Sequence, residues 1–176
     1  MSPTALALTT TTVALTIAAS IAAAQAASTD QFCKQLKAVV AEAPNGFASL
    51  QGQKTSQEAS QTDPGTSFDH YAVSATLDGA TSCDMMLEQP ASSDGKHFPN
   101  YTCAFQITGG DKGVATRKLA TRVAACLPGI SHPSGPGLDK DGGMLTAHSA
   151  DYSVGYSFIS GPASTTIKFS IQSDTK

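Results

Sequence analysis

The sequence predicts an α+β domain: an antiparallel sheet of about five to six strands, two helices packed on one face, and reinforcement by disulfides. Two segments have apolar residues at helical spacing, and each precedes segments in which apolar and polar residues alternate. Short turns between the alternating segments are typical of antiparallel pairing. Four Cys follow an apolar leader, and an even number of Cys in an exported chain indicates disulfides.

The first helix is expected near the start of the mature chain. Ser28-Thr29-Asp30 offers N-caps, and apolar residues recur at helical spacing until Pro44-Asn45-Gly46 ends the segment. Residues 47–50 predict a short strand. Residues 51–66 are rich in Gln, Ser and Thr and contain Asp63-Pro64-Gly65, so we expect a polar loop there.

Three strands are expected next. Apolar and polar residues alternate over 70–77, and Asp78-Gly79 predicts a turn. The following two strands each place apolar residues on one face, over 83–87 and 101–107. The polar stretch between them, up to residue 100, predicts a loop.

A second helix is expected over 113–127, where apolar residues return to helical spacing before Pro128-Gly129. Residues 131–143 are rich in Gly and Pro and predict an exposed loop. Alternation over 152–158 and 167–171 predicts two final strands, the first of which can begin as early as Leu145.

The leader indicates export. Residues 1–29 contain no Lys, Arg, Asp or Glu, and small residues close the apolar run, so residues 1–26 are interpreted as a signal peptide cleaved after Ala24 or Ala26. Residues 27–176 then form one secreted or periplasmic domain, without stable membrane insertion after cleavage. The alternative is an uncleaved membrane anchor over residues 5–24, which the Thr residues and the scarcity of large aliphatic residues disfavour.

The cysteines permit three pairings, and the strand pattern favours one of them. Cys83 and Cys103 lie on neighbouring strands, and their midpoint falls next to the turn-forming Asp94-Gly95, so a symmetric hairpin would place them opposite each other. Cys33 and Cys126 then pair and join the two helices. The alternative, a redox or metal site, lacks a Cys-x-x-Cys motif and an accompanying His pair.

Composition and spacing argue against several functions. Charged residues make up 14% of the chain, and the net charge is −3. The densest basic run is Arg117-Lys118 with Arg122, whose spacing is typical of a solvated helix face. No nucleic-acid partner is therefore expected. A calcium loop begun at Asp139 fails at Gly143, Met144 and Ala150. The four His are isolated in sequence and predict no metal site: His70, His97, His132 and His148.

Catalytic signatures are also weak. A Gly-x-Ser-x-Gly elbow is missing from the sequence, and Ser134 and Ser160 each precede a Gly-Pro turn. Carboxylates in or beside the expected strands could assemble a glycosidase pair in space: Asp69, Asp84, Glu88 and Asp151. Alternation places Asp84 and Glu88 on the face away from Cys83, where exposed sheet surface is the simpler interpretation. Asn100-Tyr101-Thr102 matches the glycosylation pattern of a eukaryotic secretory pathway.

These observations favour a secreted or periplasmic non-enzymatic binding protein, of an inhibitor or immunity type, without a cofactor. It would contact another protein of the envelope or exterior through loops at 51–66, 89–100 and 131–143. The alternatives are an envelope structural or stress protein without a discrete site, and a small secreted hydrolase whose site is assembled from distant residues.

Overall fold

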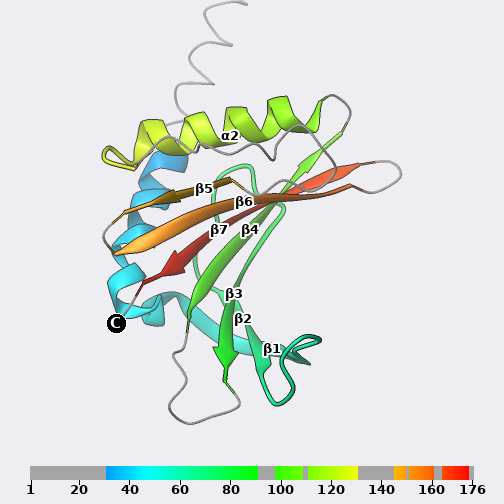
Figure 1. Cartoon of the computed structure of the whole chain (residues 1–176). Coiled ribbons are helices and arrows are strands. Elements are labelled where there is room, and N and C mark those ends of the chain that lie inside the picture. The colour runs from blue at the N-terminus through cyan, green and yellow to red at the C-terminus, as the bar shows by residue number, and fades with distance from the viewer. Residues whose placement is uncertain are drawn as a thin grey trace, which may run out of the picture.

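The computed structural model describes residues 31–90, 98–108, 111–130, 145–149, 151–160 and 164–174. Within these residues the chain forms an antiparallel sheet in the order β1-β2-β3-β4-β7-β6-β5 (Figure 1). A helix over residues 31–41 precedes the sheet, and α2 (Lys112–Cys126) separates β4 from β5. The strands are β1 (Gln51–Ala59), β2 (Ser67–Val73), β3 (Ser82–Gln89), β4 (Asn100–Ile107), β5 (Leu145–His148), β6 (Tyr152–Ser160) and β7 (Thr165–Ser173).

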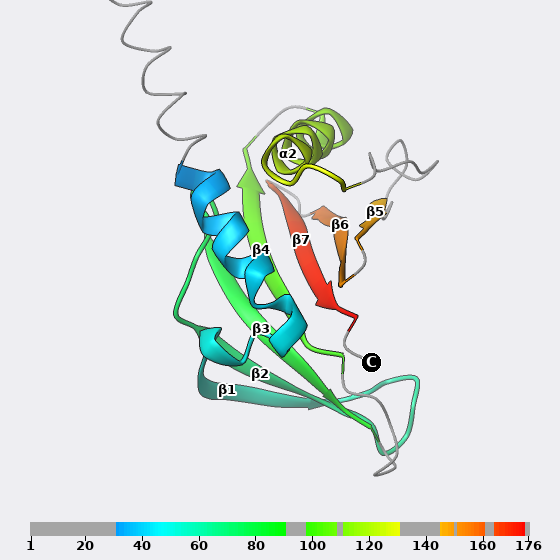
Figure 2. The same cartoon turned by 90° about the vertical axis from the view of Figure 1, so that its left-hand side faces the viewer.

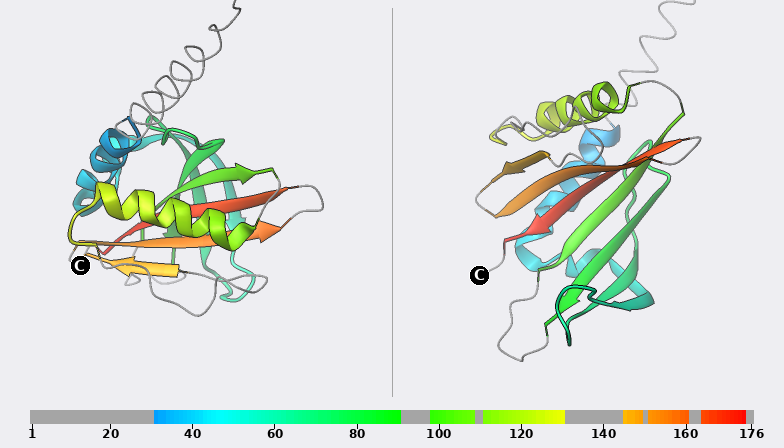
Figure 3. Two further views of the ribbon diagram at one scale, coloured as in Figure 1. Left: turned by 90° about the horizontal axis from the view of Figure 1, so that it is seen from above. Right: turned by 45° about the vertical axis from the view of Figure 1, so that its right-hand side comes forward.

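The predicted fold class is confirmed: two helices lie on the same side of an antiparallel sheet (Figure 2), and two disulfides reinforce the domain. The described residues form two halves, each a helix followed by a series of antiparallel strands. The halves join where β4 pairs with β7 along the whole of β4. Figure 3 shows α2 lying across the part of the sheet that contains β6 and β7.

The core lies between the helices and one face of the sheet. Every second residue of β4, β6 and β7 points into it, because successive side chains of a strand alternate between faces. The helices contribute their apolar stripes to the same layer. The fully buried side chains of this core include Phe32, Leu36, Val39, Tyr101, Cys103, Val123, Val154, Tyr156, Phe169 and Ile171.

The polar loop expected over residues 51–66 is wrong in its first part, because residues 51–59 form strand β1. This strand pairs with β2 through the backbone, and all nine of its side chains are exposed. The sequence of β1 therefore lacks the alternation of apolar and polar residues that would predict a strand. Only residues 60–66 form the turn that was expected.

The short strand expected over 47–50 is also wrong. Two 3₁₀ turns, Ala43–Asn45 and Ala48–Leu50, flank Gly46 and Phe47, which both adopt left-handed backbone conformations with φ of 63° and 59°. This conformation is uncommon for a bulky residue. The fully buried Phe47 ring packs 6.1 Å from the Tyr101 ring, and this burial offsets the backbone cost.

Several expectations concern segments outside the described residues. These are the leader with its cleavage sites and the alternative anchor, the loop at 131–143 with Ser134 and the calcium-like sequence, and His97 and His132. No helix in the part of the chain that the structure describes is long and apolar enough to span a membrane.

Candidate functional site

Both disulfides are present, and they join the pairs expected from the sequence. Cys83 and Cys103 are direct partners across β3 and β4, with Cα atoms 4.1 Å apart. Cys33 of the first helix is bonded to Cys126, the last residue of α2, across a Cα distance of 5.0 Å. The first bond fixes neighbouring strands and the second fixes the two helices to each other.

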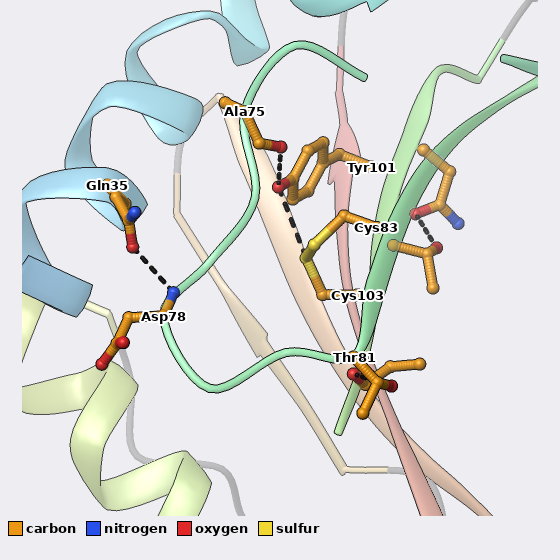
Figure 4. The surroundings of a disulfide bond; sticks show 10 residues. Gln35, Ala75, Asp78, Thr81, Cys83, Tyr101 and Cys103 are labelled. Atoms are coloured by element: carbon orange, nitrogen blue, oxygen red, sulfur yellow. Dashed lines mark hydrogen bonds between the residues drawn. A yellow bond between two sulfur atoms is a disulfide. The ribbon is translucent and has the colours of Figure 1, made fainter. Parts of the chain in front are cut away.

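The segment that connects β2 to β3 is held over the Cys83–Cys103 bond (Figure 4). The Tyr101 hydroxyl donates to the Ala75 carbonyl at 2.8 Å and lies 3.3 Å from Cys103 Sγ. Burial, and secondarily the negative charge of Asp84, raises the pKa of Tyr101. The Asp78 amide donates to Gln35 Oε1 at 2.7 Å, which ties the same segment to the first helix.

Arg122 completes this attachment from α2. Its guanidinium lies 4.0 Å from the centre of the Phe32 ring and donates to Asp78 Oδ2 at 3.0 Å. The sequence suggested a solvated basic helix face here, but the Arg122 side chain is only 26% exposed. Arg122 is thus a structural bridge between α2, the first helix and the β2–β3 connection.

The outer face of the sheet, away from the helices, carries a row of three charged or polar side chains on β1, β2 and β3. His70 Nδ1 lies 3.3 Å from Asp84 Oδ2, and His70 Nε2 lies 3.5 Å from Glu58 Oε1. The exposed fractions are 65% for Glu58, 22% for His70 and 46% for Asp84. Glu88 is on the same face of β3, as alternation predicted.

The geometry limits what this row can do chemically. The two carboxylates face different ring nitrogens, so they cannot bind one metal ion together with the imidazole. Among the described residues there is no group of three or more ligands placed to hold a metal, and His70 Nε2 has no hydrogen-bond partner. A triad would require a hydroxyl hydrogen-bonded to that nitrogen.

The inner face of the same strands holds an ion pair. Lys54 Nζ of β1 lies 2.7 Å from Asp69 Oδ1 of β2, and the Tyr71 hydroxyl donates to Asp69 Oδ2 at 3.4 Å. Asp69 is 7% exposed, so its carboxylate is buried and paired rather than displayed on the surface. Of the other carboxylates expected near strands, Asp151 precedes β6, in the other half of the sheet from Asp84.

Two of the three loops expected to contact a partner emerge at one end of the sheet. Ala59, Ser67 and Gln89 lie side by side in the register of β1, β2 and β3, so the 60–66 turn lies at the end of the sheet where β3 ends (Figure 1). We call this region the loop end: residues 60–66 and 98–100. The third loop, 131–143, lies outside the described residues.

The turn at the loop end is held by its own side chains. The Asp63 amide donates to Ser60 Oγ at 3.0 Å, and the Thr66 hydroxyl donates to Asp63 Oδ2 at 2.7 Å. The Ser60 amide also donates to the Thr66 carbonyl at 2.9 Å. These bonds satisfy the turn internally and fix its shape.

The loop end also carries an exposed aromatic residue, just before β4. Phe98 is 37% exposed, whereas the next residue, Pro99, is buried and its carbonyl accepts from the Ser173 amide at 3.0 Å. The backbone at Pro99 is therefore anchored to β7 while the neighbouring Phe98 ring remains partly in solvent.

Charge is divided between the layers of the molecule. The two helices and their flanking residues carry Lys34, Lys37, Lys112, Arg117, Lys118 and Arg122, with Glu42 and Asp111 as their described carboxylates. In contrast, strands β1, β2 and β3 and the 60–66 turn are mainly acidic. Their basic residue is Lys54, and their acidic residues are Glu58, Asp63, Asp69, Asp84 and Glu88.

Sequence reasoning missed Glu58, Lys54 and Phe98 as parts of these arrangements. Glu58 and Lys54 were assigned to a loop, and a single exposed Phe has no sequence signature.

Comparisons with protein-family models, curated proteins and solved structures found no match for the chain.

Proposed function

We propose that the chain is an exported, non-enzymatic binding protein that contacts a partner protein through the loop end. The observation that carries this proposal is that the 60–66 turn lies at the end of the sheet where β3 ends and β4 begins, with Phe98 partly exposed next to the anchored Pro99. Binding residues are commonly found on loops that a rigid scaffold positions.

The scaffold behind the loop end supports the proposal. Two disulfides restrict its helices and central strands, and such bonds fit an oxidising extracellular or periplasmic compartment. A loop that is already ordered loses less conformational entropy when it binds, so more of the contact energy contributes to affinity. The internal hydrogen bonds of the 60–66 turn provide this order.

The partner's chemistry follows from the charges beside the loop end. Glu58, Asp63 and Glu88 lie on or next to it, so a surface with Lys or Arg residues would be complementary and would associate faster at low salt. Phe98 would enter an apolar pocket of the partner, as aromatic residues at the centre of interfaces do.

The test is partner capture from the exported fraction of the source organism with three immobilised proteins: wild type, Phe98→Ser and Val114→Ser. Val114 is 55% exposed on α2, so its variant removes an apolar surface residue away from the loop end. We expect Phe98→Ser to weaken binding of the captured protein about 30-fold, the size of a hot-spot truncation of about 2 kcal/mol.

Val114→Ser should bind like wild type. Unchanged binding by Phe98→Ser, or equal losses in both variants, would contradict the proposal. If the three proteins capture nothing specific, the alternative of an envelope structural protein without a discrete site would be favoured.

A further inference from the structure

Strand β1 has almost no apolar contribution to its attachment. All nine residues are exposed and eight of them are polar or Gly, whereas β4 and β7 each bury alternate side chains in the core. Burial of apolar area is the main source of stability for most elements. For β1 that source is missing, so it is held by its backbone ladder, its charges and two exposed side-chain hydrogen bonds to β2. Thr55 Oγ1 donates to the His70 carbonyl at 3.2 Å, and Gln57 Nε2 donates to Ser67 Oγ at 3.1 Å.

The backbone ladder of β1 is interrupted. Its register with β2 shifts between Gln51 and Lys54 and again between Lys54 and Ser56. At Gly52 the two strands approach so closely that a Cβ atom would lie 2.8 Å from the Ala72 carbonyl oxygen. Regular pairing is therefore confined to residues 56–59. Residues 51–55 depend more on individual side-chain contacts, such as that of Lys54 with Asp69.

The charges of β1 make contacts on both faces of the sheet. Because the register shifts after Lys54, this residue faces the buried Asp69 on the inner face, whereas Glu58 faces His70 on the outer face. The Glu58 contact is largely exposed and contributes little. The Lys54–Asp69 pair contributes more, because without Lys54 a buried carboxylate loses its cation.

The same features prevent another chain from pairing with the outer edge of β1. Register shifts and an inward-facing Lys are devices by which edge strands avoid pairing with other chains. Strand β2 behind it differs: it is regular, and Phe68, Tyr71 and Val73 are half-buried. An added strand is thus favoured on β2 and disfavoured on β1.

We propose that β1 is a displaceable edge strand, held by the Lys54–Asp69 pair, whose release exposes β2 to an extended segment of a partner protein. Residues 51–59 would open as a unit while β2 to β7 remain folded, as low-stability segments do in native proteins. The partner would then pair with the β2 backbone and place a cation against Asp69. The binding of a partner segment to β2 rests on the proposed function, whereas the opening of β1 does not.

The opening is tested by hydrogen exchange of the full chain read out by mass spectrometry. Three proteins are compared: wild type, Lys54→Met, and Lys168→Met, which removes an exposed lysine from β7. We expect residues 52–59 to exchange faster than β4 and β7 in wild type, and about tenfold faster again in Lys54→Met, with β4 and β7 unchanged. Lys168→Met should match wild type.

A second variant removes the risk that an orphaned carboxylate unfolds the whole chain. Lys54→Met/Asp69→Asn deletes both charges and should also accelerate exchange in β1 alone. Protection of β1 equal to that of β4 in wild type would overturn the inference. So would a uniform acceleration across the sheet in the double variant.

The binding of an extended segment to β2 is tested with a fluorescent synthetic peptide of residues 51–59. The peptide should bind the Lys54→Met chain more tightly than the wild-type chain, because the endogenous strand is released and Asp69 is free to accept the peptide's lysine. A peptide with Met in place of this lysine should bind more weakly. Faster exchange in β1 without any peptide binding would overturn strand addition at β2, but it would leave the proposed contact through the loop end intact.

Discussion

Removal of the Cys33–Cys126 bond is expected to cost more stability than removal of the Cys83–Cys103 bond. The bonds close segments of 93 and 20 residues. If each bond acts by restricting the unfolded chain, its loss lowers the free energy of unfolding by about 4.7 kcal/mol for the long loop and about 3.3 kcal/mol for the short one. The difference, about 1.4 kcal/mol, depends only on the logarithm of the ratio of loop lengths.

The two pairs are well matched for this comparison. Each joins a half-buried cysteine, Cys33 or Cys83, to one that is almost completely buried, Cys126 or Cys103. Replacing both members by Ala therefore leaves similar cavities, and the cavity contributions cancel in the difference. Urea unfolding followed by far-ultraviolet circular dichroism measures both double variants. A Cys83→Ala/Cys103→Ala variant that is destabilised as much as Cys33→Ala/Cys126→Ala, or more, would refute the loop-length reasoning.

Two further predictions concern individual side chains. Burial raises the pKa of Tyr101 and of Tyr156, so these phenols ionise first in the unfolded chain. Their contribution to the free energy of unfolding should be constant below about pH 10 and fall as the pH rises further, by up to about 1.4 kcal/mol per pH unit for each group. Absorbance titration at 295 nm should show both phenols ionising only with unfolding, and ionisation in the folded state would contradict this. Arg122→Met should lower the free energy of unfolding by about 1–2 kcal/mol through loss of the Phe32 and Asp78 contacts. The exposed Lys118→Met should change it little, and equal effects in the two variants would contradict the bridging role of Arg122.

The sequence predicted the elements that bury one face. Alternation over 101–107 and 167–171 coincides with β4 and β7, because their inward side chains form the core and must be apolar. The helix expected over 113–127 matches α2 within one residue at each end for the same reason. The disulfide pairs could be argued from these elements, since pairing depends on which strands are neighbours and which ends of helices meet.

Strand β1 could not be predicted in this way. Its side chains are all exposed, so selection for a buried face leaves no period of two in its sequence. The turn at Gly46 and Phe47 was missed for another reason: a left-handed Phe is sustained by tertiary contacts with Tyr101 that a local pattern does not contain.

The side-chain contacts on β1 to β3 and the loop end both depend on strand β1, so the sequence predicted them only in part. Alternation correctly placed Asp84 on the outer face, but its contact with His70 requires the register of β2 with β3. Glu58 and Lys54 meet their partners only once β1 exists as a strand. The grouping of two loops at one end likewise follows from the row Ala59, Ser67 and Gln89, a property of strand register.

The most direct test of the central claim, partner binding through the loop end, is hydroxyl-radical footprinting of the full chain with and without its captured partner. We expect the partner to lower labelling of Phe98 and of residues 60–66, while labelling of Val114 on α2 is unchanged. Protection of Val114 with Phe98 still fully labelled would place the interface on the helix layer and contradict the account.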